Sequence, residues 1–259
     1  MIAPLAPLLL LALSGGPACG LPPIAAGAPP WTTGETLSLD LDLFGMVKAA
    51  TLELSVERPM AISGGRIVPL RARARSDPSV QKLKSLTAVG LSWVDGRTLV
   101  PERYREEADE DGVHKVSDAR LTPPGPQIDI AYQVAGKDSA GHFPREGAVL
   151  DAISAVYLLR AARLAPGDRF CFDLVARGRV WRVAGVVAAK VERLDTAVGK
   201  LDTLRLDAKA HLADRPADAP SDMHVWLSTD SRRLFVAAVG DIDAGPVRAM
   251  LTGVRGGRR

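Results

Sequence analysis

The chain has 259 residues, and its 33 Lys and Arg against 30 Asp and Glu give a formal charge of only +3, which excludes a strong polyelectrolyte as partner. Hydrophobic residues make up 47% of the sequence and charged residues 24%, so the chain can bury a real core instead of remaining disordered. Two cysteines and four histidines leave no basis for a disulfide framework, a zinc ribbon or a multi-histidine centre. We therefore expect no metal and no cofactor.

Residues 1–20 have the features of a secretory signal peptide. They carry no charged side chain. Their apolar run Leu8–Leu13 lies between prolines and a glycine pair and is too short for a membrane-spanning helix. Small residues at Ala18 and Gly20 predict cleavage after Gly20, and hence export to the periplasm or cell envelope. Because no Lys or Arg precedes the apolar run, the true translation start is left open.

Cys19 admits a second hypothesis, in which a lipid attached to this cysteine tethers the protein to a membrane. The cysteine follows small residues, but Gly16 stands three positions before it, where lipoprotein signals usually have an aliphatic residue. Removal with the signal peptide and acylation both stay open, and membrane contact is expected only with acylation. In either case Cys171, between Phe170 and Phe172, is expected to be a small packing residue in a strand rather than a nucleophile.

Past a Pro-rich lead-in at residues 21–33, apolar and polar side chains alternate with period two. Residues 37–43 and 52–56 predict an antiparallel hairpin around Gly45, because alternation is typical of half-buried strands. A later run leads into Asp95-Gly96, a dipeptide that favours a tight hairpin turn. Further strands are predicted at residues 68–74, 89–93 and 128–134.

Two segments predict helices. Asp77 is an N-cap acceptor and Pro78 suits the first helical position, so we expect a short helix over residues 79–86. A longer helix is expected from about Ala148 to Arg163, where apolar residues recur at helical spacing until Pro166-Gly167 stops the pattern.

The second half of the sequence returns to strands and has no composition break that marks a linker. Strands are predicted at residues 170–174, 181–191, 204–210, 224–228, 234–239 and 247–251. We expect one β-rich domain over residues 34–253, followed by a disordered basic tail at residues 254–259.

Four motifs in a fixed order carry a resemblance to a known family. They are Gly34-Glu35-Thr36-Leu37, the helical segment Asp151–Arg160, Leu164-Ala165-Pro166-Gly167-Asp168, and Trp226-Leu227-Ser228-Thr229-Asp230. Their order and spacing resemble the bacterial family called domain of unknown function 3108, over most of residues 34–253. The resemblance implies an exported envelope protein and carries over no catalytic residue.

A meandering exported sheet with a long helix is also similar to the open barrels of bacterial lipoprotein carriers and related periplasmic β-spiral proteins. We therefore expect a mainly β protein, built as a single curled antiparallel sheet of about a dozen strands with one longer and one short helix. Such an open or incomplete barrel can curl around a helix or around an acyl chain, and the fold does not choose between them.

The long helix carries four candidate ligand-binding residues: Arg160, Tyr157, Ser154 and Asp151. Arg160 shares an apolar stripe with Tyr157, so its guanidinium must be paired if it is buried. The favoured interpretation is an internal ion pair, or an arginine whose guanidinium reaches solvent along an apolar stem. The alternative is a ligand carboxylate or phosphate held by bidentate hydrogen bonds. Asp151 and Ser154 lie near the helix start, where capping of free N–H groups is favoured over a catalytic role.

Two further candidates follow from the segment before the penultimate strand. If that strand is regular, Trp226, Ser228 and Asp230 lie on one face and line the mouth of a pocket. Alternatively, Asp230 begins the turn that reverses the chain, which is the favoured interpretation.

Catalysis and nucleic-acid binding have little support in the sequence. There is no Gly-x-Ser-x-Gly motif, and His142 falls in an expected loop at residues 136–147. Aromatic residues make up 5% of the chain and none interleaves the basic run Arg71, Arg73, Arg75, so no nucleic-acid partner is expected.

These observations leave three hypotheses of function. In the first, a non-catalytic envelope protein holds a hydrophobic, lipid-like ligand or a partner segment in its curled sheet. In the second, the long helix fills the barrel, and the outer face or an edge strand of this scaffold recruits another envelope protein. The third, an envelope hydrolase, requires a Ser, His and Asp cluster that only folding could assemble.

Overall fold

The structure, a computed structural model, describes residues 20–43, 45, 47–82, 84–122, 124–242 and 245–256. These residues form one 16-stranded sheet and one helix, α1 (Ala152–Ala161). The strands are β1 (Thr36–Leu43), β2 (Val47–Val56), β3 (Met60–Ile62), β4 (Gly65–Ser76), β5 (Leu86–Asp95), β6 (Pro101–Glu110), β7 (Val113–Arg120), β8 (Gln127–Val134), β9 (Lys137–Pro144), β10 (Val149–Asp151), β11 (Arg169–Ala176), β12 (Arg179–Thr196), β13 (Gly199–Leu212), β14 (Ser221–Ser228), β15 (Phe235–Ile242) and β16 (Gly245–Arg255). The expectation of a mainly β protein with a single curled sheet is confirmed.

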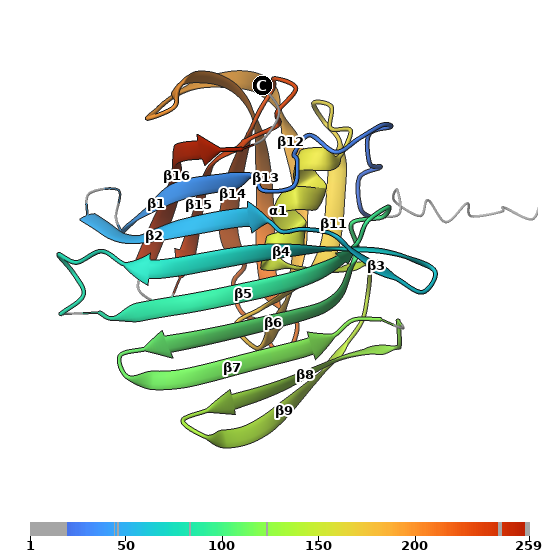
Figure 1. Ribbon diagram of the computed structural model, residues 1–259, viewed down its shortest axis with the longest axis vertical. Helices are drawn as coiled ribbons and strands as arrows, with labels where there is room; N and C mark the ends of the chain where they lie inside the picture. Colours follow the sequence, from blue (N-terminus) through green and yellow to red (C-terminus); the bar gives the residue numbers. More distant parts are fainter. Residues whose placement is uncertain are drawn as a thin grey trace, which may run out of the picture.

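The sheet is an open spiral whose two halves face each other across α1 (Figure 1). The strand order runs β10-β11-β12-β13-β14-β15-β16-β1-β2-β4-β5-β6-β7-β8-β9, with β3 beside β4. Neighbouring strands are antiparallel except β10 and β11, which are parallel because α1 connects them. Pairing of β1 with β16 joins the two ends of the domain, which makes the first and last strands neighbours in the middle of the sheet.

Alternating hydrophobicity explains why these segments are strands. In β1, Leu37 and Leu39 are fully buried and the intervening Ser38 is half-buried, so one face of the strand turns toward the interior. Opposite them, Leu54 of β2 and Leu251 of β16 are also buried. The predicted hairpin of the first two strands is thereby confirmed.

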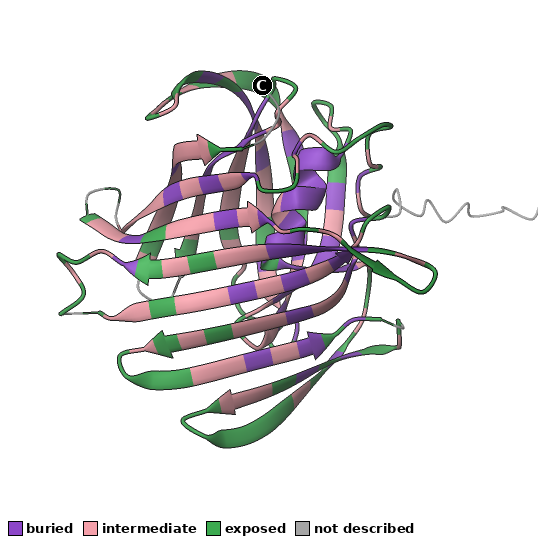
Figure 2. Ribbon diagram, viewed as in Figure 1, coloured by how far each residue is buried: buried purple, intermediate pink, exposed green. Residues whose placement is uncertain are grey.

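Helix α1 lies inside the curl and contacts β4, β5, β10 and β11. Eight of its ten residues are buried, so the helix is enclosed on nearly every side. Burial is concentrated on the helix and on the parts of the strands next to it, whereas much of β7, β8 and β9 is exposed (Figure 2). The core is therefore the space between the helix and the surrounding sheet.

The lead-in before the first strand is attached to the carboxyl end of α1. Ile24 forms an isolated bridge with Ala162, and the Ala25 N–H donates to the Ala161 carbonyl at 2.8 Å. Trp31 is buried against the helix, 4% exposed. These contacts satisfy a carbonyl that the helix end would otherwise leave free.

Two local expectations about helices are wrong. Residues 78–82 form turns instead of a short helix, with the Asp77 carbonyl accepting from both Val80 and Gln81. Leu86 belongs to β5, and the residues that are left are too few for a stable helix. The long helix begins at Ala152 rather than near Ala148, since residues 149–151 pair with β11 as a strand.

Two strand expectations also need correction. The loop expected at residues 136–147 contains β9, which sequence alternation did not reveal because this edge strand is exposed over most of its length. In the expected disordered tail, Val254 and Arg255 belong to β16 and pair with Leu37 and Thr36, while residues 257–259 lie outside the described residues.

Close packing between β11, β12 and β13 generates a prediction at Gly185. A Cβ added there would lie 2.5 Å from the Asp207 carbonyl oxygen and 2.9 Å from Ala208 Cβ. Because backbone cannot move aside, Gly185→Ala is expected to lower the free energy of unfolding by about 1–3 kcal/mol in urea denaturation. Gly147→Ala is the matched control, since nothing lies within 4 Å of its Cβ position. Equal stability of the two variants would contradict the packing described.

Candidate functional site

Arg160 is buried at the carboxyl end of α1 and is surrounded by partners from distant parts of the chain. Its Nη1 donates to Glu35 Oε1 at 2.6 Å, and both side chains are at most 2% exposed. Its Nε donates to the Arg233 carbonyl at 2.8 Å and its Nη2 to the Arg232 carbonyl at 3.2 Å. The prediction that Arg160 belongs to an internal ion pair is confirmed.

Two aromatic rings complete the surroundings of Arg160. Its Cζ lies 5.2 Å from the ring centroids of both Trp31 and Tyr157, and these two rings meet edge to face at 5.1 Å. Burial raises the pKa of the Tyr157 phenol, and its hydroxyl makes no hydrogen bond within the described ranges. Arg160 therefore ties α1 to the lead-in, to Glu35 before β1, and to the turn before β15.

Asp151 caps the opposite end of α1. Its Oδ1 accepts from the N–H groups of Ile153 and Ser154, both at 2.9 Å. In return, Ser154 Oγ accepts from the Asp151 N–H at 2.9 Å. Ser92 Oγ of β5 donates to the other carboxylate oxygen at 2.5 Å. The capping role predicted for Asp151 and Ser154 is confirmed, and complete burial raises the pKa of Asp151 from 3.8 to about 6.

Trp226 and Asp230 have separate hydrogen-bond partners. Trp226 Nε1 donates to Glu192 Oε2 at 2.7 Å, whereas Asp230 accepts from Ser228 Oγ at 2.8 Å and binds the Arg232 guanidinium. A register shift beside Trp226 interrupts the regular strand that would have put the three residues on one face. Asp230 lies in the turn between β14 and β15, as the favoured interpretation predicted.

A cavity of about 600 Å³ opens beside the carboxyl end of α1. We call it the mouth cavity. Its walls come from residues 24–30 of the lead-in, the turn after β5, residues 160–164, and the turn before β15. Of the six candidate ligand-binding residues, Arg160 lines this cavity and the other five do not. Binding of a ligand by any of the six stays a prediction.

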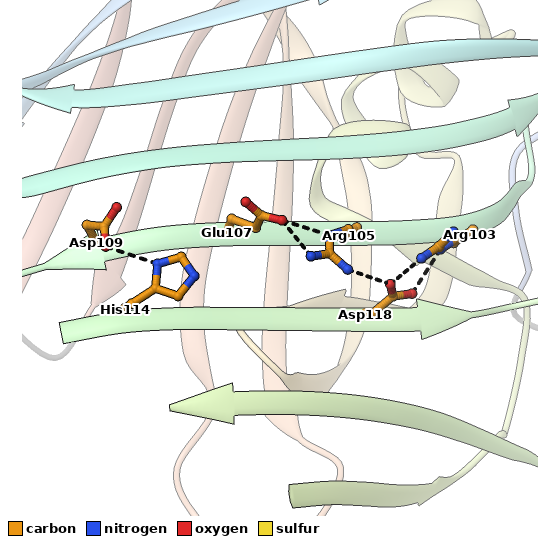
Figure 3. Close-up of polar contacts among 6 residues, drawn as sticks. All are labelled: Arg103, Arg105, Glu107, Asp109, His114 and Asp118. Carbon is orange, nitrogen blue, oxygen red and sulfur yellow. Dashed lines mark hydrogen bonds and ion pairs between the residues drawn. The ribbon is translucent and has the colours of Figure 1, made fainter. Parts of the chain in front are cut away.

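A second hollow, of about 660 Å³, lies on the face of β6 to β9, where arginines are neutralised by acids. Asp118 of β7 accepts from both Arg103 and Arg105 of β6, and Arg105 Nη2 also donates to Glu107 at 2.6 Å (Figure 3). Asp109 lies 3.0 Å from the ring of His114 on the same pair of strands. This face therefore carries polar pairs within β6 and between β6 and β7, which stabilise the exposed part of the sheet.

Folding pairs three of the four histidines with aspartates. The Nδ1 atoms of His142 and His224 lie 2.7 and 2.6 Å from Asp129 and Asp207, on the same pattern as His114. Across the described residues, no serine hydroxyl is hydrogen-bonded to a histidine, and no three metal-ligating side chains come together. No helix in the described part is long and apolar enough to span a bilayer.

Sequence reasoning did not identify the partners of Arg160 or the arginines of the mouth cavity. Glu35 stood in one of the family motifs, but a separation of 125 residues gives no local signal for its pairing with Arg160. Alternation gives no information about side-chain contacts in the lead-in, in turns or at the ends of segments. Those are the places of Trp31, Arg97, Arg163 and Arg233. Cys19 and its candidate lipidation, like residues 1–18 of the signal peptide, lie outside the described residues.

The fold and the helix-centred ion pair define a class of open, barrel-like β protein wrapped around a single helix. Within that class, the chain belongs to the family described as protein of unknown function (DUF3108), whose model matches residues 38–252. This membership confirms the resemblance carried by the sequence motifs. None of the curated proteins matches the chain.

Solved structures are similar to the chain at low sequence identity, and the first of them shares its fold. A β-barrel-like protein of domain of unknown function DUF1849 from Brucella abortus is 13% identical, with a TM-score of 0.52, covering 86% of this chain and 97% of its own. A candidate lipoprotein from Parabacteroides distasonis is 11% identical, with a TM-score of 0.39, covering 88% and 97%. A candidate exported protein with a YmcC-like fold from Bacteroides fragilis is 12% identical, with a TM-score of 0.36, covering 89% and 100%.

The buried ion pair predicts a large stability loss when one partner is removed. Arg160→Met leaves the Glu35 carboxylate buried and unpaired, so the free energy of unfolding should fall by about 3–5 kcal/mol. The double variant Arg160→Met/Glu35→Gln should recover part of that loss, because the orphaned charge is gone. Urea denaturation of both variants and of Glu35→Gln measures the coupling. An unchanged midpoint for Arg160→Met would reject a structural role for this pair.

The buried cap predicts a pH dependence of stability. Because the folded-state pKa of Asp151 is about 6 and the ordinary pKa of an aspartate is 3.8, the folded chain holds this proton more tightly than the unfolded chain. The contribution of this carboxyl group to the free energy of unfolding is therefore greatest below pH 3.8, falls as the pH rises to about 6, and is constant at higher pH. Asp151→Asn keeps a good N-cap and removes the titration.

Urea denaturation should be measured from about pH 3.5 to 8. The wild-type chain should lose stability relative to Asp151→Asn as the pH rises from 3.8 to about 6, and the difference between the two proteins should be constant at higher pH. The contributions of all other titrating groups are the same in both proteins and cancel in the difference. Parallel curves for the two proteins would show that the carboxyl group is not perturbed by burial.

Proposed function

We propose that this protein is a non-catalytic, exported scaffold of the cell envelope, in which α1 fills the curled sheet and the outer strands hold a partner. The single observation that supports the proposal is the burial of eight of the ten residues of α1 inside the curl. The space that a carried acyl chain would need is taken by the helix and by Trp31, Tyr157 and their neighbours. A helix-filled core leaves the exposed parts of the sheet for function.

The part of the sheet beyond the helix is the proposed partner surface. The strand order ends at β9, whose outer edge is unpaired within the described residues. Lys137, Asp138, Ser139 and Ala140 on that strand are exposed. An edge of this kind accepts an added strand through main-chain hydrogen bonds, so an extended segment of another envelope protein is the proposed partner.

Native mass spectrometry of protein purified from its own envelope tests the filled interior. We expect the native mass of the Arg233→Gln variant to equal its denatured mass, with no lipid in an organic extract. Arg233→Gln is the control that weakens binding in the mouth cavity and leaves the enclosed core unchanged, because the Arg233 side chain lines that cavity. An extracted lipid that this variant still carries would lie inside the curl and would overturn the scaffold.

Site-specific photo-cross-linking in the envelope tests the partner surface. A cross-linker at Ser139 on β9 should give a discrete adduct with another envelope protein, whereas one at Val191, which is 59% exposed on β12, should not. Pro substitutions at positions 138 and 140 block main-chain hydrogen bonding and should abolish the adduct. Equal labelling from both positions, or none from Ser139, would refute binding at this edge.

A further inference from the structure

The mouth cavity concentrates positive charge. Arg97, Arg160, Arg163 and Arg233 line it, and none of the residues that line it is acidic. The protein as a whole has a formal charge of only +3, so this local excess does not reflect a generally basic surface. A cleft lined by charges of one sign raises the local concentration of oppositely charged ligands.

Three of these guanidinium groups have no counter-ion. Arg160 is neutralised by Glu35, but Arg97, Arg163 and Arg233 have no carboxylate within 4.0 Å among the described residues. Exposed arginines elsewhere in the sheet, such as Arg73 and Arg75, also form no ion pair among the described residues. What distinguishes the mouth cavity is that four arginines line one hollow without an acid, whereas Asp118 pairs two of the arginines that line the second hollow (Figure 3).

Arg233 is the most constrained of the three. Its Nη2 is buried and has no hydrogen-bond partner in the described part of the chain, and burial lowers the pKa of its guanidinium. Its backbone is held in place by Arg160, which donates to the carbonyls of Arg232 and Arg233. The buried ion pair thus fixes the position of an unpaired cation at the cavity wall, which is an arrangement that a ligand anion would complete.

Backbone strain coincides with the same wall. Five non-glycine residues have positive φ, and three of them, Asp111, Ala135 and Arg177, precede glycine in two-residue hairpin turns that require it. The other two are Leu99, at φ 58°, and Arg233, at φ 46°, and both line the mouth cavity. Left-handed conformation of such residues is costly and is concentrated at functional sites.

The carboxyl end of α1 also lies at the cavity and attracts cations. Its effect is equivalent to roughly half a negative charge, which falls off within one turn. The Ala161 carbonyl is already taken by the Ala25 N–H, and the last-turn Arg160 already serves the helix end. The helix terminus therefore gives the three guanidinium groups no direct partner, and Asp95 acts on Arg97 and Asp230 on Arg233 only from beyond 4.0 Å.

We propose that the mouth cavity binds a phosphate group, either free or at the head of an amphiphile. A dianionic phosphate suits a cavity lined by three arginines without an ion-pair partner better than a singly charged carboxylate does, and guanidinium forks bind its oxygens bidentately. The volume of about 600 Å³ exceeds that of phosphate, and Ile24, Leu99 and Leu164 supply an apolar wall beside the arginines. This site is separate from the filled core and from the β9 edge.

Isothermal titration calorimetry of the full exported chain tests the site with three probes. Inorganic phosphate and dodecyl phosphate below its micellar concentration carry the anion, and dodecyl maltoside carries a similar tail without charge. Arg233→Gln and Arg163→Gln should each weaken binding of the phosphate probes about tenfold or more, the loss of one charge-assisted hydrogen bond. Affinity should also fall with added salt.

Arg177→Gln is the matched control, because Arg177 also has positive φ at 52° and does not line the cavity. It should bind like the wild type. Since the side-chain Nη2 of Arg233 has no partner, Arg233→Gln should retain its unfolding midpoint, which separates lost binding from lost folding.

The probes distinguish the two sources of phosphate. Equal affinity for both phosphate probes supports free phosphate, and tighter binding of dodecyl phosphate supports a lipid-like headgroup. No binding of either probe, equal binding of dodecyl maltoside, or unchanged affinity in Arg233→Gln would overturn the proposal. None of these results depends on the helix-filled core or the partner at β9.

Discussion

The pairing of Arg160 with Glu35 inside the curl is the interaction on which the arrangement of this protein depends. A guanidinium this deeply buried is tolerated only when its charge and its N–H groups are satisfied, and here a carboxylate, two carbonyls and two aromatic rings do so together. Those partners come from the lead-in, from Glu35 just before β1, from α1 itself and from the turn before β15. One side chain therefore fixes the helix relative to both halves of the sheet.

The same side chain connects the interior with the surface of the mouth cavity. Its hydrogen bonds hold the backbone of residues 232–233 in a conformation that an arginine rarely adopts. The energy that stabilises the core thereby supports local strain at the cavity wall. This coupling explains how a filled, rigid interior and an unpaired cation can occur a few ångströms apart in one structure.

Enclosing a helix in an open sheet also decides which part of the sheet is available to partners. Strands next to α1 bury their inner faces, while β7 to β9 extend past the helix and rely on cross-strand ion pairs such as those of Asp118. Exposed ion pairs stabilise weakly, so this region is expected to be the least stable part of the sheet. A partner strand added at β9 would compensate for that deficit.

The sequence by itself determined the class of fold, most of the strands and the helix that occupies their interior. Period-two alternation is a local property, and the capping by Asp151 and Ser154 involves neighbours in sequence, so both are readable without the structure. β9 was missed because exposed edge strands need no alternation, and the short helix was wrongly predicted because its capping signals precede too few residues for a stable helix. That Arg160 required a partner also followed from its place on an apolar stripe.

Only the tertiary structure decided which carboxylate pairs with Arg160 and where the unpaired arginines gather. Glu35 and Arg160 are 125 residues apart, and Arg97, Arg163 and Arg233 come from three separate connections. Their proximity results from how far the sheet curls and where its strand order begins and ends. Those quantities depend on the sum of twist and pairing over all 16 strands, which no local pattern records.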